Sequence, residues 1–145
     1  MTAIDAAIGP GLPEAKASLS VLRRPDFTIA RLEGDLDIAT VPALRERLLG
    51  VLRGVRLLIV DLSGVSFCDT SGLAMLIGMQ RHAGARRITV RLAAPRPQVT
   101  ELLGNTGLDR CFTICTTLSS ALPSKRREPR IATAPSLAEA AKVRQ

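Results

Sequence analysis

Four consecutive residues, Asp69-Thr70-Ser71-Gly72, carry the side chains in this chain that are best suited to chemistry. They follow an apolar run typical of a buried strand and lead into the helical pattern expected over residues 71–83. Ser71 is therefore predicted at the start of a helix, where free backbone N–H groups and the helix dipole favour negative charge. A phosphate on Ser71 would add about −1.5 to −2 charges, and those N–H groups are expected to hold it without unfolding the domain.

A simpler interpretation is that Thr70 or Ser71 only caps the helix, as Ser and Thr commonly do. Gly72 is expected to leave room for a molecule that approaches the Ser71 hydroxyl. Asp69 is expected either to cap the helix or to orient that hydroxyl. Its carboxylate would also repel an incoming phosphate, so its net effect stays open.

Hydrolysis by Ser71 itself is not supported by the sequence. A serine nucleophile needs an adjacent base, and His82 is the single histidine of the chain. It follows Ser71 on the same predicted helix at a distance of about 16 Å along the axis. The flanking residues also lack the Gly-x-Ser-x-Gly pattern of hydrolases. The chain is therefore predicted not to be an enzyme.

Three cysteines, Cys68, Cys111 and Cys115, cannot all pair within the chain and are expected to be small buried hydrophobic residues in a reducing compartment. The spacing of Cys111 and Cys115 would supply two of the four ligands of a closed zinc site, and the single histidine does not complete it. We expect no metal and no other cofactor.

Strand and helix patterns alternate between residues 18 and 122. The first amphipathic helix is expected to have Thr40 as its N-cap and to end at Gly54, after the pair Gly34-Asp35 has broken the preceding strand. The alternation predicts a single α/β domain with a mostly parallel or mixed sheet of about four to five strands and about four helices. The strands are expected over 18–22, 27–32, 56–62, 87–92 and 111–115, and the later helices over 71–83, 98–103 and 117–122.

The two ends of the chain differ from this domain in composition. Residues 1–17 are rich in Ala, Gly and Pro and are expected to form a flexible leader. Residues 123–145 are a basic, Pro-containing tail in which Ser136 and Glu139 are spaced to cap a short terminal helix. The sequence has no signal-peptide pattern and no apolar run of the about 20 residues that cross a membrane. We therefore expect a cytoplasmic protein.

The net charge of +7 does not by itself indicate a nucleic-acid-binding protein. Positive and negative residues are interspersed over residues 23–122, and much of the remaining excess lies in the tail. Phe27, Phe67 and Phe112 are the only aromatic residues, and each lies in an apolar, strand-like context. The sequence therefore offers no exposed stacking platform for single-stranded nucleic acid, and direct nucleic-acid binding is not expected.

The segment Asp69-Thr70-Ser71-Gly72-Leu73, with Val60-Asp61-Leu62-Ser63 and Val65-Ser66-Phe67 before it, resembles the signature of STAS domains in bacterial anti-sigma factor antagonists. A second block, Gly34-Asp35-Leu36-Asp37-Ile38-Ala39-Thr40, opens the first predicted helix as the Gly-acid-Leu-Asp segment of that family does. The resemblance covers residues from about 18 to 122.

This resemblance implies that Ser71, directly before the glycine, is phosphorylated, with Thr70 as a minor alternative. Family members bind a kinase-like anti-sigma factor in their unmodified form and thereby free the sigma factor for RNA polymerase. Phosphorylation by that partner weakens the complex, and a phosphatase restores it; ATP, Mg²⁺ and the catalytic base belong to the kinase. The partner-binding surface is expected to comprise Asp37, Thr40, Asp69, Thr70, Ser71, Gly72 and Leu73.

The same fold also suits a non-switching scaffold or a small-ligand-binding module linked to membrane transport. The serine at position 71 favours the switch, because Ala or Asp there would have favoured a scaffold. Nucleic-acid binding through Arg126, Arg127 and Arg130 of the tail is a further alternative. The free protein is expected to be a monomer, because no long exposed apolar stripe remains once the core is assigned.

Overall fold

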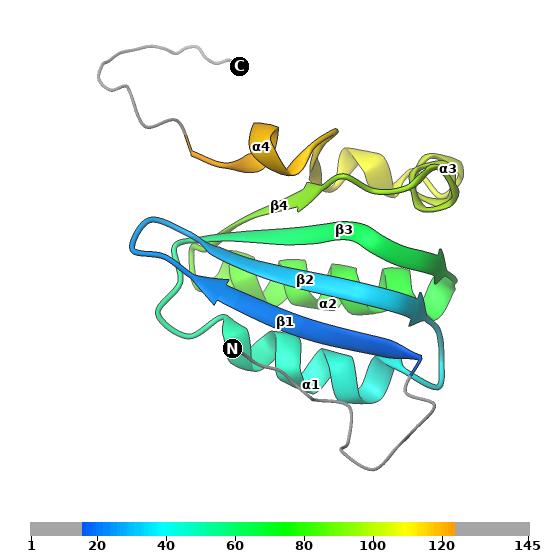
Figure 1. The fold of residues 1–145 in the computed structure, drawn as a ribbon, viewed down its shortest axis with the longest axis horizontal. Helices are drawn as coiled ribbons and strands as arrows, with labels where there is room; N and C mark the ends of the chain where they lie inside the picture. Colours follow the sequence, from blue (N-terminus) through cyan, green and yellow to red (C-terminus); the bar gives the residue numbers. More distant parts are fainter. Residues whose placement is uncertain (1–15, 124–145) are drawn as a thin grey trace.

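The computed structural model describes residues 16–123 of the chain (Figure 1). Most of the expected leader and tail, including the helix expected after Ser136, lies outside the described residues. The elements in chain order are β1 (Ala17–Arg23), β2 (Thr28–Leu36), α1 (Val41–Val51), β3 (Leu57–Cys68), α2 (Thr70–Ala85), β4 (Thr89–Ala93), α3 (Pro97–Asn105), the 3-10 helix η1 (Leu108–Arg110), β5 (Thr113–Cys115) and α4 (Leu118–Ala121).

The five strands form one sheet in the order β1-β2-β3-β4-β5. β1 is antiparallel to β2, and the three remaining pairs are parallel. Helices α1 and α2 lie side by side on one face of the sheet (Figure 1). On the other face, Ala121 of α4 packs with Leu57, Ile59 and Ala93 in a smaller apolar cluster. The structure thus confirms the predicted α/β domain with a mixed sheet.

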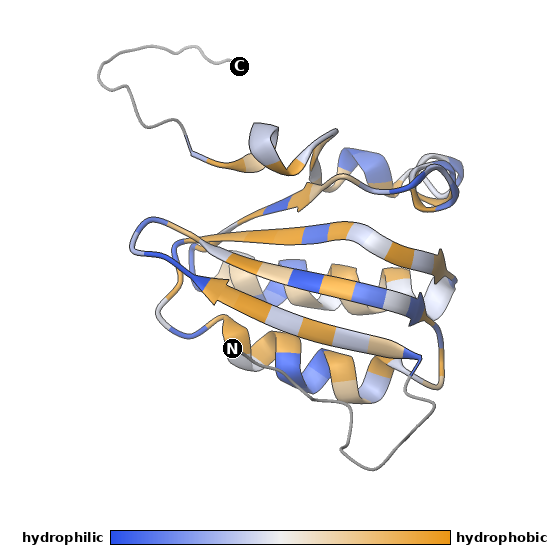
Figure 2. Ribbon diagram, viewed as in Figure 1, coloured by the Kyte–Doolittle hydropathy of each residue, from blue (hydrophilic) through white to orange (hydrophobic). Residues whose placement is uncertain are grey.

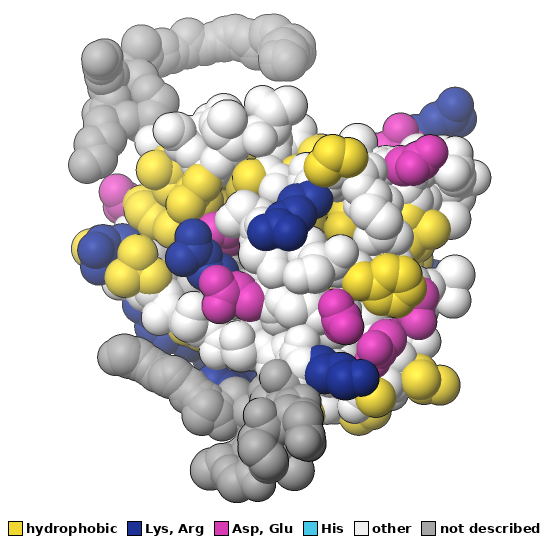
Figure 3. All heavy atoms as spheres, turned by 45° about the vertical axis from the view of Figure 1, so that its right-hand side comes forward, with side chains coloured by type: hydrophobic (Ala, Val, Ile, Leu, Met, Phe, Trp, Pro, Cys, Tyr) yellow, Lys and Arg dark blue, Asp and Glu magenta, His cyan; other side chains and the backbone are white. Residues whose placement is uncertain are grey.

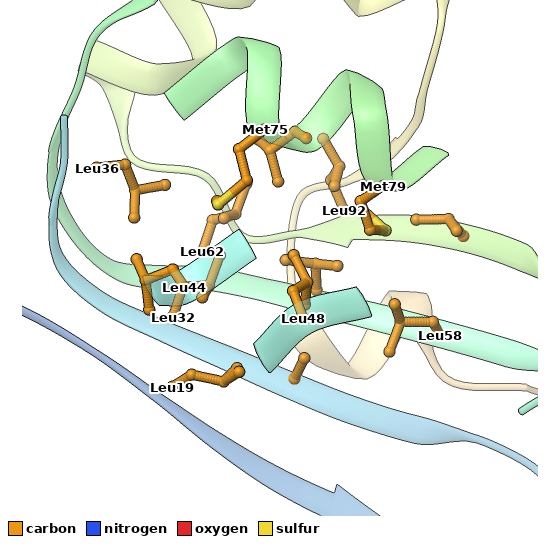
Figure 4. Packing of buried hydrophobic residues seen from close by; sticks show 14 of the residues in the cluster. Leu19, Leu32, Leu36, Leu44, Leu48, Leu58, Leu62, Met75, Met79 and Leu92 are labelled. Atoms are coloured by element: carbon orange, nitrogen blue, oxygen red, sulfur yellow. The ribbon is translucent and has the colours of Figure 1, made fainter. Parts of the chain in front are cut away.

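The main core fills the space between the sheet and the helices α1 and α2. From Ala30 to Leu36, apolar or small residues alternate with charged ones along β2, so that this part of the strand turns its apolar side to one face (Figure 2). Ile29, before it, packs in the smaller cluster on the other face. Leu57 to Leu62 in the central strand β3 are all buried, as expected for a strand covered on both faces. Leu44 and Leu48 of α1 and Met75 and Met79 of α2 close the core from the helix side (Figure 4).

Asp61 is a buried acidic residue in this apolar strand, with 2% of its side chain exposed. The Arg31 Nε atom donates to its Oδ2 atom at 3.2 Å, and the Ser63 N–H donates to its Oδ1 atom at 3.0 Å. Both carboxylate oxygens therefore have a partner, as a buried charge requires. The pair also joins the neighbouring strands β2 and β3.

Several strand boundaries differ from the sequence-based expectation; β5, for example, starts at Thr113 rather than at residue 111. Three of the differences have a clear structural reason. Gly34 and Asp35 were expected to break the second strand, but β2 continues to Leu36 through register shifts against β3. Gly34 permits this because its φ is +95° and a Cβ there would lie 1.9 Å from the Lys16 carbonyl oxygen. β3 likewise continues to Cys68 alongside β2.

The third difference lies between α2 and β4. Arg87 was expected to open a strand, but its φ is +61°, and it turns the chain after the helix instead. This left-handed conformation usually belongs to glycine at a helix end, and it costs other residues about 1–2 kcal/mol. Strand β4 therefore starts at Thr89.

Candidate functional site

The predicted site residues lie at the end of the sheet where β2 and β3 finish. We call this end the site end. Leu36 and Cys68, the last residues of the two strands, are paired, and the Asp69 N–H donates to the Leu36 carbonyl oxygen at 3.1 Å. The segments that follow these strands, residues 37–40 and 69–72, therefore start next to each other. The structure brings the two blocks of the sequence resemblance together.

Asp69 is the N-cap of α2. Its Oδ1 atom accepts the N–H groups of Ser71 at 2.8 Å and of Gly72 at 3.3 Å. Of the two roles left open for Asp69, the structure shows the cap. The same bonds revise the expectation that these N–H groups would hold a phosphate, because a carboxylate already occupies them.

Ser71 lies in the first turn of α2 and is partly exposed, and Thr70 beside it is exposed. The Ser71 hydroxyl makes no hydrogen bond to any residue within 16–123, although its N–H is bonded to Asp69. The hydroxyl is thus neither the cap of the helix nor fixed in an internal network. His82 lies three turns further along α2, as expected, and is not placed to act as a base for Ser71.

Gly72 has a different role from the one expected. It is buried, and a Cβ atom there would lie 2.7 Å from Cys68 Sγ, 2.8 Å from Leu36 Cβ and 3.0 Å from the Leu36 carbonyl oxygen. The missing side chain lets α2 start in direct contact with the ends of β2 and β3. Gly72 therefore does not open space for a visiting molecule; it allows the close packing that places Ser71.

The turn between β2 and α1 is closed by the side chains of Asp37 and Thr40. Asp37 Oδ1 accepts the N–H groups of Ala39 at 2.9 Å and Thr40 at 3.1 Å. The Thr40 hydroxyl donates to the Asp35 carbonyl oxygen at 2.7 Å and accepts the Asp37 N–H at 3.0 Å. Thr40 is the N-cap residue of α1, as predicted, but its side chain makes no cap hydrogen bond to the N–H groups of that helix.

Three of the seven expected partner-binding residues are buried: Thr40, Gly72 and Leu73. Gly72 has no side chain, and the buried side chains of Thr40 and Leu73 present little surface to a partner. They hold the turn and the helix start in place. Asp37, Asp69, Thr70 and Ser71 are at least partly exposed at the site end.

Two apolar residues at the site end were missed by the sequence reasoning. Ile38, between the two residues that close the turn, is 79% exposed, and Phe67, near the end of β3, is 44% exposed. The apolar strand-like context predicted that Phe67 is covered, and this is wrong. Acidic and hydrophobic side chains lie near one another on the side of the molecule that is brought forward in Figure 3. One sequence signal could have indicated this exposed surface: Ile38 is apolar but lies outside any helical or strand periodicity.

The free edge of β3 at the site end is supported by α3. Strand β4 pairs with Leu57–Asp61, and among residues 16–123 no strand lies beside the rest of β3 on that side. Gln98 Oε1 accepts the Cys68 N–H, and Gln98 Nε2 donates to the Cys68 carbonyl oxygen, both at 3.0 Å. Arg96 Nε donates to the Ser63 carbonyl oxygen at 2.7 Å. These bonds fix the strand end that carries Phe67 and leads into Asp69.

The cysteines do not form a reactive centre at the site. Cys68 is buried, and burial, followed by the charge of Asp69, raises the pKa of its thiol to about 11. A thiol with that pKa stays protonated at neutral pH and is a poor nucleophile. Cys111 is exposed and Cys115 half-buried, so only Cys68 matches the expected burial. Within residues 16–123, no three His, Cys, Asp or Glu side chains are grouped to hold a metal ion.

Comparison with protein families matches residues 18–121 to the STAS domain. A STAS-domain containing protein of Pseudomonas aeruginosa is 27% identical over 84 residues, which are 58% of this chain and 83% of that protein. A probable sulfate transporter of Arabidopsis thaliana is 33% identical over 79 residues, 52% of this chain. The match spans only 12% of the transporter.

Solved structures show the same fold. An anti-sigma factor antagonist from Mycobacterium paratuberculosis is 25% identical, with a TM-score of 0.66 over 74% of this chain and 92% of that one. The anti-sigma factor antagonist SpoIIAA in its unphosphorylated form is 23% identical, with a TM-score of 0.62 over 72% of this chain and 92% of that one. At 23% identity, the similarity to SpoIIAA shows a shared fold and nothing more. No helix within the described residues combines the length and apolar character needed to cross a bilayer.

Proposed function

Because the chain belongs to the STAS domain family, we propose that it is an anti-sigma factor antagonist whose partner binding is switched by phosphorylation of Ser71. The unphosphorylated protein binds an anti-sigma factor with serine kinase activity, and the sigma factor is released. Phosphorylation of Ser71 by that partner weakens the complex, and a phosphatase reverses it. This activity places the protein in the cytoplasm and requires no catalytic group or cofactor of its own.

The observation that carries this proposal is the partly exposed Ser71 hydroxyl beside a helix N-terminus that Asp69 already caps. The capped N–H groups cannot also bind a phosphate on Ser71 unless the carboxylate is displaced. The phosphate therefore points outward, next to the negative charge of Asp69. A dianion in a close interface with no cation to pair with it costs several kcal/mol. A penalty of about 3 kcal/mol weakens binding roughly a hundredfold.

The exposed residues around Ser71 supply the contact surface. Ile38 and Phe67 are apolar side chains of the kind that anchor an interface, and Asp37, Asp69 and Thr70 supply polar contacts near them. Thr70 is also the alternative phosphate acceptor, because it is exposed directly beside Ser71. We expect the free protein to be a monomer with this surface open to solvent.

The proposal is tested by mixing the purified protein with anti-sigma factors of the serine kinase type and ATP. Mass spectrometry then locates the added phosphate, and binding is measured for Ser71→Ala, Ser71→Asp and Thr70→Ala. We expect Ser71→Ala to bind without being modified, Ser71→Asp to bind poorly and Thr70→Ala to resemble the parent protein. Modification at Thr70 alone, or equal affinities for both Ser71 variants, would contradict the proposal.

A second candidate function is a non-switching STAS module, a scaffold or a small-ligand-binding unit. The similarity to part of a probable sulfate transporter favours it. In that case no kinase modifies Ser71, and Ser71→Ala and Ser71→Asp leave partner binding unchanged. The same experiment therefore separates the two functions.

A further inference from the structure

The end of the sheet opposite the site end carries a cluster of arginines. The parallel pairs Thr28–Leu58 and Leu57–Thr89 place the starts of β2, β3 and β4 at this end, on the left of Figure 1. The connections that lead into these strands therefore meet there, and the β1–β2 turn is strongly hydrophilic (Figure 2). We call this cluster the basic pole; it consists of Arg23, Arg24, Arg53, Arg56, Arg86 and Arg87.

The basic pole accounts for the net positive charge of residues 16–123. All six arginines are exposed, and Asp26 is the only acidic residue in the three connections. Residues 16–123 contain fourteen Lys and Arg and nine Asp and Glu. Without the six arginines and Asp26, eight basic and eight acidic residues remain, so the rest of the domain has no net charge. None of the six forms a salt bridge within the described residues.

Helix dipoles explain only part of this cluster. Helices α1 and α2 both end at the basic pole, and cations near a helix C-terminus are favourable, which accounts for Arg53, Arg86 and Arg87. Arg23 ends a strand, Arg24 lies in a turn, and Arg56 precedes a strand, so none of these three is explained in this way.

Arg87 carries its charge at a position where the backbone favours glycine. After α1 the chain turns at Gly54, with φ +69°, whereas after α2 it turns at Arg87, with φ +61°. Glycine suits this conformation best, yet the second turn carries a basic side chain. The backbone at this exposed turn does not require a basic side chain, and Arg87 adds its charge to the basic pole.

We propose that the basic pole is a peripheral docking surface for the phosphates of anionic phospholipid headgroups. Arginine pairs with phosphate through two parallel hydrogen bonds, and arginines from three connections at one end match a surface with many phosphates. Leu22, 44% exposed next to Arg23, adds an apolar side chain. Two helix C-termini face this end and offer no free N–H groups, so the long side chains make the contacts.

Single-stranded nucleic acid fits the basic pole less well. The aromatic residue nearest to it, Phe27, is partly buried and packs against the small cluster on the α4 face, so no exposed ring is available for stacking on bases. Docking on a membrane through the basic pole turns the site end toward solvent. The proposal is independent of the proposed function, because the two surfaces share no residue.

Vesicle co-sedimentation of the full chain tests this inference. Vesicles of phosphatidylcholine alone are compared with vesicles that also contain phosphatidylglycerol, at low and at physiological salt. Each arginine near an anionic surface contributes about fivefold in affinity, or about 1 kcal/mol, and salt screens this attraction. We expect binding only to the anionic vesicles, and weaker binding at the higher salt concentration.

Two triple variants locate the binding surface. Arg24→Gln/Arg56→Gln/Arg86→Gln removes three charges of the basic pole and is expected to weaken vesicle binding about a hundredfold. The matched control Arg45→Gln/Arg47→Gln/Arg81→Gln removes three charges from α1 and α2 outside the pole and is expected to retain most of the binding.

The single variant Arg87→Gly tests the turn separately. Glycine suits the backbone at this position, so thermal stability is expected to be kept or raised while vesicle binding falls about fivefold. Failure of the parent protein to bind anionic vesicles, or equal losses in the two triple variants, would overturn the proposal. Binding of duplex DNA that only the pole variant loses, without vesicle binding, would assign the surface to nucleic acid and would also overturn it.

Discussion

The two ends of the sheet differ both in their connections and in their charge: β2 and β3 lead into helices at the site end, whereas the β1–β2 turn and the connections from α1 and α2 into strands lie at the basic pole. At the site end, α2 begins, and acidic side chains accept backbone N–H groups; Asp37 and Asp69 both do this. At the basic pole, α1 and α2 end, and arginines surround the helix C-termini. In a parallel sheet the helices run antiparallel to the strands, so their dipoles favour acids at one end and bases at the other. Chain direction therefore accounts for the capping acids and for Arg53, Arg86 and Arg87, but not for the other three arginines of the basic pole. It does not account for the exposed apolar residues Ile38 and Phe67 either.

The largest effect on stability is expected at Gly72. Gly72→Ala places a methyl group within 3 Å of Cys68 and Leu36, so either the start of α2 or the strand ends must move. We expect a loss of about 1–3 kcal/mol in the free energy of unfolding, measured with urea. Gly78→Ala is the matched control in the same helix, since a Cβ there meets no atom within 4 Å. It is expected to stabilise the domain by about 0.5–1 kcal/mol; equal effects of the two variants would show that Gly72 is not a packing residue.

Next in size is the loss of partner binding when the exposed apolar residues of the site end become polar. Ile38→Ser and Phe67→Ser are each expected to weaken binding of the anti-sigma factor by about tenfold or more, because buried interface anchors contribute at least about 1–2 kcal/mol. Stability is expected to change by less than about 0.5 kcal/mol for Ile38→Ser, which is 79% exposed. Leu22→Ser, at an equally exposed position on β1, serves as the control for Phe67. A similar loss of binding for Leu22→Ser would mean that the contact surface extends beyond the site end.

A smaller effect is expected from the cap of α2. Asp69→Ala removes the acceptor for two N–H groups and is expected to cost about 1 kcal/mol of stability, whereas Asp69→Asn keeps an acceptor and costs less. Asp69→Asn also removes the charge next to Ser71, so the penalty of Ser71→Asp on partner binding is expected to shrink in the double variant. Calorimetry of the four proteins of this cycle measures the coupling. Additive effects would show that Asp69 does not act on the charge at position 71.

The smallest effect concerns the pH dependence of stability. Burial raises the pKa of Cys68 from 9.0 to about 11, so the folded state resists ionisation of this thiol. The stabilising contribution is fully present below pH 9 and is lost as the pH rises toward 11. Unfolding free energies measured across this range are expected to fall more steeply for the parent protein than for Cys68→Ala. Parallel curves would show that this thiol ionises equally in the folded and unfolded states.

Much of the fold could be predicted from the chain because it depends on local patterns. The apolar run at Leu57–Val60 predicted the central strand, and the spacing of Leu44 and Leu48 predicted the first helix; both are confirmed. Boundaries set by distant partners could not be predicted. The end of β3 depends on the side chain of Gln98, 30 residues away, and on the bulged pairing with β2.

In the candidate site, too, features set by local sequence could be predicted, and features set by distant partners could not. The position of Ser71 at a helix start follows from local sequence, and the structure confirms it. The functions of Gly72 and Thr40 depend on neighbours from other elements, Leu36 and Asp35, which local patterns do not show. The exposure of Phe67 depends on which helices cover each face of the sheet, and no residue near Phe67 encodes this.

Placing the same negative charge at two positions tests whether the Ser71 hydroxyl controls partner binding. Ser71→Asp adds it at the site end, and Ser119→Asp adds it at an exposed serine of α4. Calorimetric titration with the anti-sigma factor is expected to show a loss of affinity of at least about tenfold for Ser71→Asp and almost none for Ser119→Asp. If Ser71→Asp binds as tightly as the parent protein, a charge at this hydroxyl does not control the interface and the proposed switch is wrong.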